Sequence, residues 1–211
     1  MDPNKTKAAY KAWLREMDTF RGIVGFSAAC DYDPQKTLSE CREYDLICVA
    51  KELGLIRDCV QHAIDAAKVV AHLNDEPEVQ AAIDAAEKYL NDPTGESCFA
   101  LKTAMYYLAV MVKKLSGEPY VAARAADAAW SAALAAEAAE ESVSGVTQMD
   151  KWDKGVRIMN MGVALVSVEK AAAEAVAAAK GNPELLHKLK ELMQSFRNNV
   201  YNALMVELEN S

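Results

Sequence analysis

Aromatic residues, glycine and proline are all scarce in this chain of 211 residues. Phe, Trp and Tyr together make up 7% of the sequence, which holds 9 glycines and 6 prolines. Strands favour aromatic and β-branched residues, and the turns between short strands favour glycine and proline. The composition therefore argues against an all-β fold and predicts long helices.

The chain also lacks a long hydrophobic run. The longest uninterrupted one is Ala104–Val112, whereas a membrane-spanning helix needs about 20 apolar residues. The N-terminal segment has no apolar stretch of the kind found in secretory signal peptides. The 5 cysteines are odd in number and form no Cys-x-x-Cys pair, which favours reduced thiols packed as small apolar groups. We therefore expect a cytoplasmic protein that does not associate with membranes.

What the chain does have is a succession of segments with helical periodicity. We expect a first helix from Pro3 to about Phe20, an irregular stretch over 22–34, and then helices over about 37–53, 55–73, 77–90, 96–115, 119–143, 147–180 and from Pro183 onward. The helix over 96–115 is apolar nearly all round, so it should be central and covered on most sides. The predicted fold is an all-α bundle of about eight helices. Residues 1–211 form one helical domain in this prediction, and residues 1–54 could be a semi-independent lobe.

Two of the expected helices are rich in small residues. From Ala122 to Ala139, twelve of eighteen residues are alanine, which favours helix and lets neighbouring helices approach closely. We interpret this tract as a closely packed central helix; the alternative is a low-complexity interaction surface. In the helix over 147–180, Gly155 and Gly162 lie on one face and predict a close helix contact. The predicted buried stripe of that helix is Trp152, Val156, Met159, Val163 and Val166.

Charge is unevenly distributed along the chain. The formal net charge is −8, from 23 basic and 31 acidic residues, and no basic stripe favours direct binding of nucleic acid. Residues 74–96, called the acidic block below, contain seven acidic residues and one lysine. Such a block could occupy a basic cleft on another protein, or it could be an ordinary solvated helix face. The candidate protein-binding residues are Asp75, Glu76, Glu78, Asp84 and Glu87.

The histidines do not predict a metal site. His62 and His72 are about 15 Å apart if they share one helix, too far to bind the same ion. A di-iron bundle needs two Glu-x-x-His pairs, and the chain has only Glu184 with His187. We therefore expect no metal and no other cofactor.

A cysteine-dependent enzyme is the one catalytic alternative that the spacing allows. Cys59 and His62 are three residues apart in a predicted helix, as a nucleophile and its base could be. Cys59 falls on the apolar stripe of that helix and His62 on the polar one, however. A packed thiol beside a solvated histidine is therefore the favoured interpretation.

Residues 75–139 carry a resemblance to a known family. An acidic, Pro-containing turn leads into the helix Val79–Glu87, an apolar helix follows, and then comes the tract Ala122–Trp130. This arrangement resembles the all-helical immunity proteins of bacterial polymorphic toxin systems, some of which are phage-borne. The resemblance implies a cytoplasmic protein that binds and blocks another protein, and it transfers no binding residue.

Three functions remain open from the sequence. The first is a non-enzymatic immunity protein or phage-type inhibitor that neutralises a toxin, a nuclease or a defence complex with a basic surface. The second is a helical adaptor or structural protein that forms a homo-oligomer through the small-residue faces described above. The third is an enzyme that uses Cys59 and His62.

Overall fold

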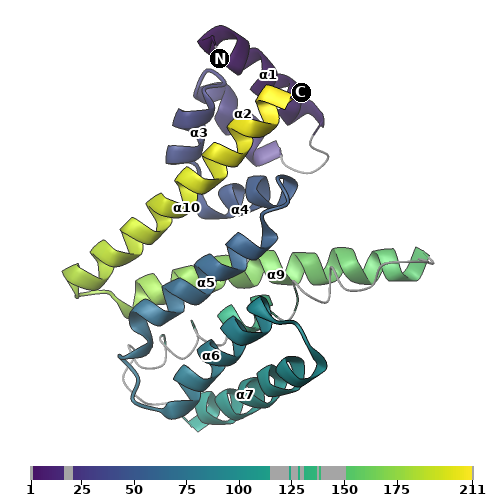
Figure 1. Ribbon diagram of the computed structural model, residues 1–211. Coiled ribbons are helices and arrows are strands. Elements are labelled where there is room, and N and C mark those ends of the chain that lie inside the picture. Colours follow the sequence, from purple (N-terminus) through teal and green to yellow (C-terminus); the bar gives the residue numbers. More distant parts are fainter. Residues whose placement is uncertain are drawn as a thin grey trace. The chain divides into compact units, whose positions relative to one another are not determined.

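The chain is all-α in the computed structural model, which describes residues 2–16, 21–114, 124, 128, 131–136, 138 and 151–210 (Figure 1). Within these ranges every regular element is a helix and no strand occurs, so the predicted fold class is confirmed. Residues 131–136, in the alanine tract, are helical as well. With the labels of Figure 1, the helices are α1 (Pro3–Glu16), α2 (Arg21–Ala29), α3 (Pro34–Glu40), α4 (Glu43–Glu52), α5 (Ile56–Ala71), α6 (Pro77–Asn91), α7 (Gly95–Lys114), α9 (Lys151–Ala178) and α10 (Pro183–Asn210).

Contacts between residues divide the chain into two compact units. The first unit contains residues 1–56 and 193–211, and the second contains residues 57–192. The sequence suggested one domain with a semi-independent lobe over residues 1–54. The first unit joins nearly that same segment to the C-terminal half of α10, so that α10 begins in the second unit and ends in the first.

Every helix of the first unit contributes to an apolar core. Its largest fully buried side chains are Tyr10 from α1, Ile23 from α2, Leu38 from α3, Leu46, Ile47 and Val49 from α4, and Leu204 and Leu208 from α10. The buried hydroxyl groups of the first unit form hydrogen bonds. The Tyr10 hydroxyl lies 3.2 Å from the Ser27 hydroxyl, which also donates to the Ile23 carbonyl at 2.7 Å.

Helix α2 occupies most of the stretch that we predicted to be irregular. Ile23 and Ser27 are one turn apart and both face the core, whereas Gly25 lies on the exposed side. A glycine there lowers the helix propensity but interrupts no packing. The burial of the inner face therefore outweighs the propensity cost of the glycine. The prediction was therefore wrong for residues 22–29. The irregular part is the following turn, where Asp31 and Tyr32 have φ angles of 56° and 51°.

The single helix predicted over 37–53 is two helices. Pro34 begins α3, and the side chain of Asp33 caps it by accepting a hydrogen bond from the Lys36 N–H at 3.0 Å. The backbone then becomes extended at Cys41 and Arg42 before α4 starts. Gly54, with φ of 75°, lies just after α4 and ends this helical segment as predicted.

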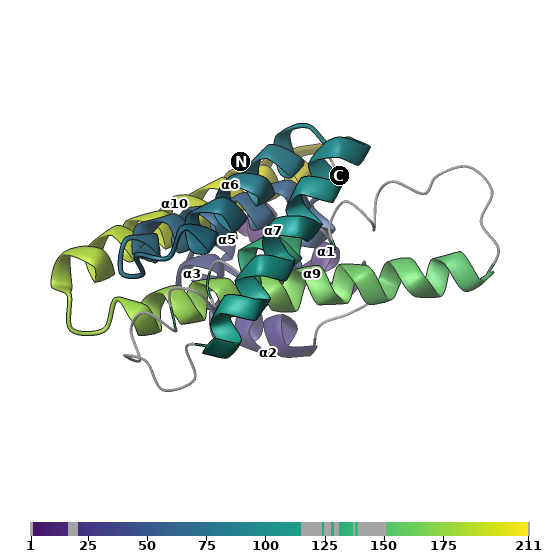
Figure 2. The ribbon, with the colours of Figure 1, turned by 90° about the horizontal axis from the view of Figure 1, so that it is seen from below.

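In the second unit, α5 and α6 confirm the predicted amphipathic patterns. The inner face expected for α6 is buried at Val79, Ala82, Ile83, Ala86 and Leu90. Helix α7 packs against α6 after the short turn Asp92–Thr94, and Figures 1 and 2 show the two helices side by side. The Arg57 side chain donates to the Leu90 carbonyl and so binds the start of α5 to the end of α6.

The described part of the alanine tract is packed. Five of its alanines are fully buried: Ala128, Ala132, Ala133, Ala135 and Ala136. Ser131 and Ala138 are almost completely buried. Arg124 in this tract donates to the Glu174 carboxylate of α9 at 2.7 Å. These positions agree with the interpretation of the tract as a closely packed helix. Residues 122, 123, 125–127, 129, 130, 137 and 139 of the tract lie outside the described residues.

The buried stripe predicted for α9 is wrong in its C-terminal part. Val163 and Val166 are exposed, and most of the buried residues described in this helix are small, including Ala164, Ala171 and Ala175. Because α9 has apolar residues on most of its sides, periodicity could not select the packed one. Gly162 is exposed, and among the described residues no atom lies within 4 Å of a Cβ built there, so they show no close helix contact at this position. The side chains of Trp152, Val156 and Met159, and Gly155, lie outside the described set.

Candidate functional site

One face of α7 exposes a group of aromatic and apolar side chains. Phe99, Tyr106 and Val110 are spaced by seven and four residues, which places them on one side of the helix, and Tyr107 lies beside them. The exposed fractions are 74% for Phe99, 66% for Tyr106 and 57% for Tyr107. We call these four residues the α7 aromatic face. It contradicts our prediction that the helix over 96–115 is covered on most sides.

The opposite side of α7 holds it in the second unit. Leu101, Met105, Leu108 and Met111 are buried there. These apolar side chains hold α7 in the second unit, so the residues of the α7 aromatic face are not needed to pack the helix. In Figure 1, α7 lies at the outer edge of the second unit and α6 lies between it and α5.

The start of α7 is fixed by a reciprocal cap. The Thr94 N–H donates to the Ser97 hydroxyl at 2.9 Å, and the Ser97 N–H donates to the Thr94 hydroxyl oxygen at 3.2 Å. Ser97 also donates to the Asp92 carbonyl at 2.6 Å. This arrangement works as a capping box and sets where the helix begins. It therefore also sets which residues point outward two turns later.

The two tyrosines of the aromatic face contact each other. Their ring centroids are 5.7 Å apart and the rings are inclined by 72°, an edge-to-face arrangement. Each ring therefore restrains the other on the surface. A prearranged pair of tyrosines suits protein binding, because tyrosine offers a large contact area with few rotatable bonds to immobilise.

The candidate residues of the acidic block do not share one face. Asp75 and Glu76 are exposed and precede α6, where the Glu76 N–H donates to the Asn74 side chain at 2.9 Å. Asp84 lies on the solvent side of α6 and accepts from the Gln80 amide at 2.6 Å. The structure thus supports an exposed acidic surface at these three positions.

Glu78 and Glu87 lie on opposite flanks of α6 and are half-buried. Glu87 pairs with Lys68 of α5 at 2.5 Å, so its charge is used within the second unit. One carboxylate oxygen of Glu78 is buried and makes no hydrogen bond to the described part of the chain. Of the five candidates, Asp75, Glu76 and Asp84 are therefore better placed to meet a partner than these two.

The Cys59 and His62 pair differs from our expectation. His62 is buried, with 7% of its surface exposed, and is not the solvated histidine predicted from the polar stripe. The buried side of α5 is thus wider than its apolar stripe, and it includes His62 together with Cys59 and Ala66. Cys59 is fully buried, as predicted. A catalytic thiol needs access to substrate, which this position in the core does not provide.

The other titratable groups are dispersed. His72 is exposed on the turn after α5, and His187 is exposed on α10 beside Glu191 at 3.3 Å. Lys188 bonds to Glu184 and lowers the pKa of that carboxyl. Within the ranges that the structure describes, no three His, Cys, Asp or Glu side chains lie close enough together to hold a metal ion.

None of the described helices combines the length and the apolar composition that a membrane span requires. Comparisons with protein-family models, with curated proteins and with solved structures found no match to this chain.

Proposed function

We propose that the protein binds another protein and blocks its activity, and that the α7 aromatic face is the centre of the contact. The observation that carries this proposal is the exposure of three aromatic rings by more than half on one helix of the second unit. Aromatic residues are enriched at the centres of protein interfaces, where they often dominate the binding energy. Burial of these rings against a partner would add hydrophobic stabilisation that the isolated chain does not obtain from them.

The chemistry of the partner follows from the charge on the adjoining helices α6 and α7 and on the turns before them. The acidic block precedes α7 directly in the chain, and its exposed members include Asp75, Glu76, Asp84, Asp92 and Glu96. A partner with an apolar pocket and a basic rim would match this surface and associate faster at low salt. We propose a toxin, a nuclease or a defence complex as that partner. The resemblance of residues 75–139 to immunity proteins supports the same class.

The direct test compares the partners captured by variants of the full chain. Phe99→Ser combined with Tyr106→Ser removes the two most exposed rings without touching the buried side of α7. Val206→Ser, at a residue that is 60% exposed on α10 in the first unit, is the matched control. We expect a partner captured from the host lysate by the wild type and by the control to be lost with the double variant. Equal capture by all three chains would refute the α7 aromatic face as the contact.

The acidic contribution has its own test once a partner is in hand. Asp84→Lys reverses an exposed charge, whereas Glu87→Lys also breaks the pair with Lys68. We expect Asp84→Lys to lower the association rate by about tenfold at low salt and to leave the dissociation rate nearly unchanged. An unchanged association rate would remove the acidic block from the interface but not the α7 aromatic face.

Self-association is the second candidate, and the exposed apolar side of α9 favours it. Val163, Val166 and Val176 are exposed, and Gly162 beside them leaves room for a second helix. Light scattering over a range of concentrations separates the two proposals. A mass that rises with concentration in the wild type and stays monomeric in Val166→Lys would support the homo-oligomer. A constant monomer mass would leave the binding of a different protein.

A further inference from the structure

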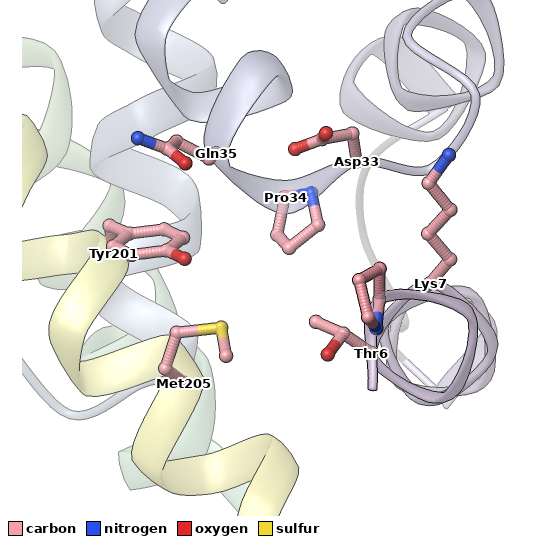
Figure 3. A pocket seen from close by; sticks show the side chains of 8 residues that line it. Thr6, Lys7, Asp33, Pro34, Gln35, Tyr201 and Met205 are labelled. Carbon is pink, nitrogen blue, oxygen red and sulfur yellow. The ribbon is translucent and has the colours of Figure 1, made fainter. Parts of the chain in front are cut away.

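A pocket of about 290 Å³ opens in the first unit between the start of α1, the start of α3 and the last turns of α10 (Figure 3). It is as large as the smaller pockets that bind organic ligands in proteins. Pro34 and Met205 supply apolar walls from α3 and α10, and the Tyr201 ring lies one turn before Met205. Three segments that are far apart in the sequence thus form one concave site.

Several polar groups that line the pocket have no hydrogen-bond partner among the described residues. The Tyr201 hydroxyl and the Gln35 amide make no hydrogen bond to any described residue, and Figure 3 shows both side chains at the pocket. Asp33 uses one carboxylate oxygen to accept from the Lys36 N–H at 3.0 Å, and its other oxygen has no such bond in the described ranges. The pocket therefore offers hydrogen-bond acceptors next to the apolar groups of Pro34 and Met205.

The rim carries one charged residue of each sign, Lys7 and Asp33. Lys7 lines the pocket with its stem, but its ammonium bonds to Asp31 at 2.6 Å, and Figure 3 shows the ammonium end turned away from Met205. The hydrogen bond to Asp31 is the main cause of the raised pKa of Lys7, and the charge of Asp33 acts in the same direction. Asp31 thus holds the ammonium of Lys7, and the second carboxylate oxygen of Asp33 remains to attract an added cation.

We propose that this pocket binds a guanidinium group carried on an aliphatic stem. The planar cation would stack on the Tyr201 ring and donate hydrogen bonds to the unused oxygens of Asp33 and Gln35. The stem would pack against Met205 and Pro34. A guanidinium suits this site better than an ammonium, because it is flat and presents its donors in one plane toward acceptors from different elements. The ligand is either a free small molecule or an arginine side chain of a peptide.

The test is a titration of the full chain with defined probes, followed by NMR of the Met205 methyl group, which Met205→Leu assigns. Agmatine represents the free guanidinium ligand, and N-acetyl-arginine amide represents an arginine within a peptide. Pentylamine has a similar stem and an ammonium, which agmatine also carries, but it has no guanidinium. We expect saturable shifts with a Kd on the order of 1 mM for at least one guanidinium probe, since the ligands are small.

Two variants connect the binding to the proposed contacts. Asp33→Asn keeps a good N-cap for α3 but removes the charge, and we expect it to weaken binding by about tenfold. Tyr201→Leu keeps an apolar side chain but removes the ring, and we expect about a fivefold loss. Lys7→Gln removes the nearest cation without touching these contacts, and we expect binding at least as tight as in the wild type.

The outcomes decide both the ligand class and its source. Binding of agmatine alone assigns a free small cation, and binding of the capped arginine as well assigns an arginine side chain. No saturable shift with either guanidinium probe up to about 10 mM would overturn the proposal. So would equal affinity for pentylamine, or an unchanged affinity in Asp33→Asn. The site lies in the first unit, so these results are independent of the α7 aromatic face.

Discussion

Arg197, in the C-terminal half of α10, donates a hydrogen bond to the backbone carbonyl of Cys41 at 2.8 Å, although 156 residues separate the two. The same guanidinium donates to the Leu38 carbonyl. One side chain thus satisfies two carbonyls at the end of α3, where the helix has no backbone partner for them. The break between α3 and α4 therefore depends on a residue from the far end of the sequence.

Replacement of this arginine should destabilise the first unit. We expect Arg197→Met to lower the free energy of unfolding by about 2–4 kcal/mol, because it leaves two part-buried carbonyls without their charged donor. Gln194→Met, at an exposed position on the same helix, should change it by less than about 0.5 kcal/mol. Urea unfolding followed by circular dichroism measures both. Equal stability of the two variants would show that water replaces the guanidinium without cost.

The two sides of α7 should respond differently to substitution. Leu108→Ala should cost about 2–5 kcal/mol, since it creates a cavity at a fully buried position. Tyr106→Ser should change stability by less than about 1 kcal/mol, because its ring is 66% exposed. Thermal unfolding of the two variants against the wild type is the measurement. A large loss in Tyr106→Ser would mean that the ring is structural and would weaken its assignment to binding.

Burial raises the pKa of Tyr10 to about 12, with a smaller opposing contribution from its hydrogen bond to Ser27. The folded state therefore holds this proton more tightly than the unfolded state does, where the pKa is about 10. The resulting stabilisation is fully present below pH 10 and disappears as the pH rises from about 10 to 12. Its size is on the order of 2 kcal/mol, from the two-unit difference in pKa.

We therefore expect alkaline unfolding that depends on Tyr10. Tyr10→Phe should lose less stability than the wild type between pH 10 and pH 12, since it has no proton to release there. Burial also raises the pKa of Cys48, from an ordinary value of 9.0 to about 12. This thiol therefore contributes to the same loss of stability, starting at a lower pH than Tyr10, so Cys48→Ala is measured alongside. Parallel pH profiles of Tyr10→Phe and the wild type would contradict this assignment.

Thiol labelling should distinguish the five cysteines by burial. Cys98 is half-buried, while Cys30, Cys41, Cys48 and Cys59 are buried. We expect one equivalent to react rapidly under native conditions and Cys98→Ser to abolish this fast phase. Mass spectrometry of the labelled peptides identifies the site. Fast labelling of Cys59 would reopen the enzyme hypothesis for that residue.

The helices that the sequence predicted well are those with one apolar side. Helix α6 has a narrow inner stripe from Val79 to Leu90 and polar residues elsewhere, so its period determines its orientation. Helices α7 and α9 have apolar residues on most sides, and their patterns do not say which side is packed. For this reason the exposed positions of Phe99 and Val166 could be found only from the structure.

The candidate sites show the same limit. The acidic block identified an exposed charged surface, but the pairing of Glu87 with Lys68 depends on how α5 packs against α6. The pocket at Asp33 and Tyr201 is formed by distant segments, and no local motif marks it. One polar residue could have suggested which side of α7 is exposed, because Thr103 lies between Phe99 and Tyr106 on the same side of the helix.

The division of the chain has a consequence for synthesis on the ribosome. The second unit is one continuous segment, whereas the first requires residues 193–211 to join residues 1–56. During translation the N-terminal helices emerge first, and they must wait for α10 before their core can close. The second unit can fold in the meantime, so the later part of the chain is expected to reach its native state ahead of the beginning.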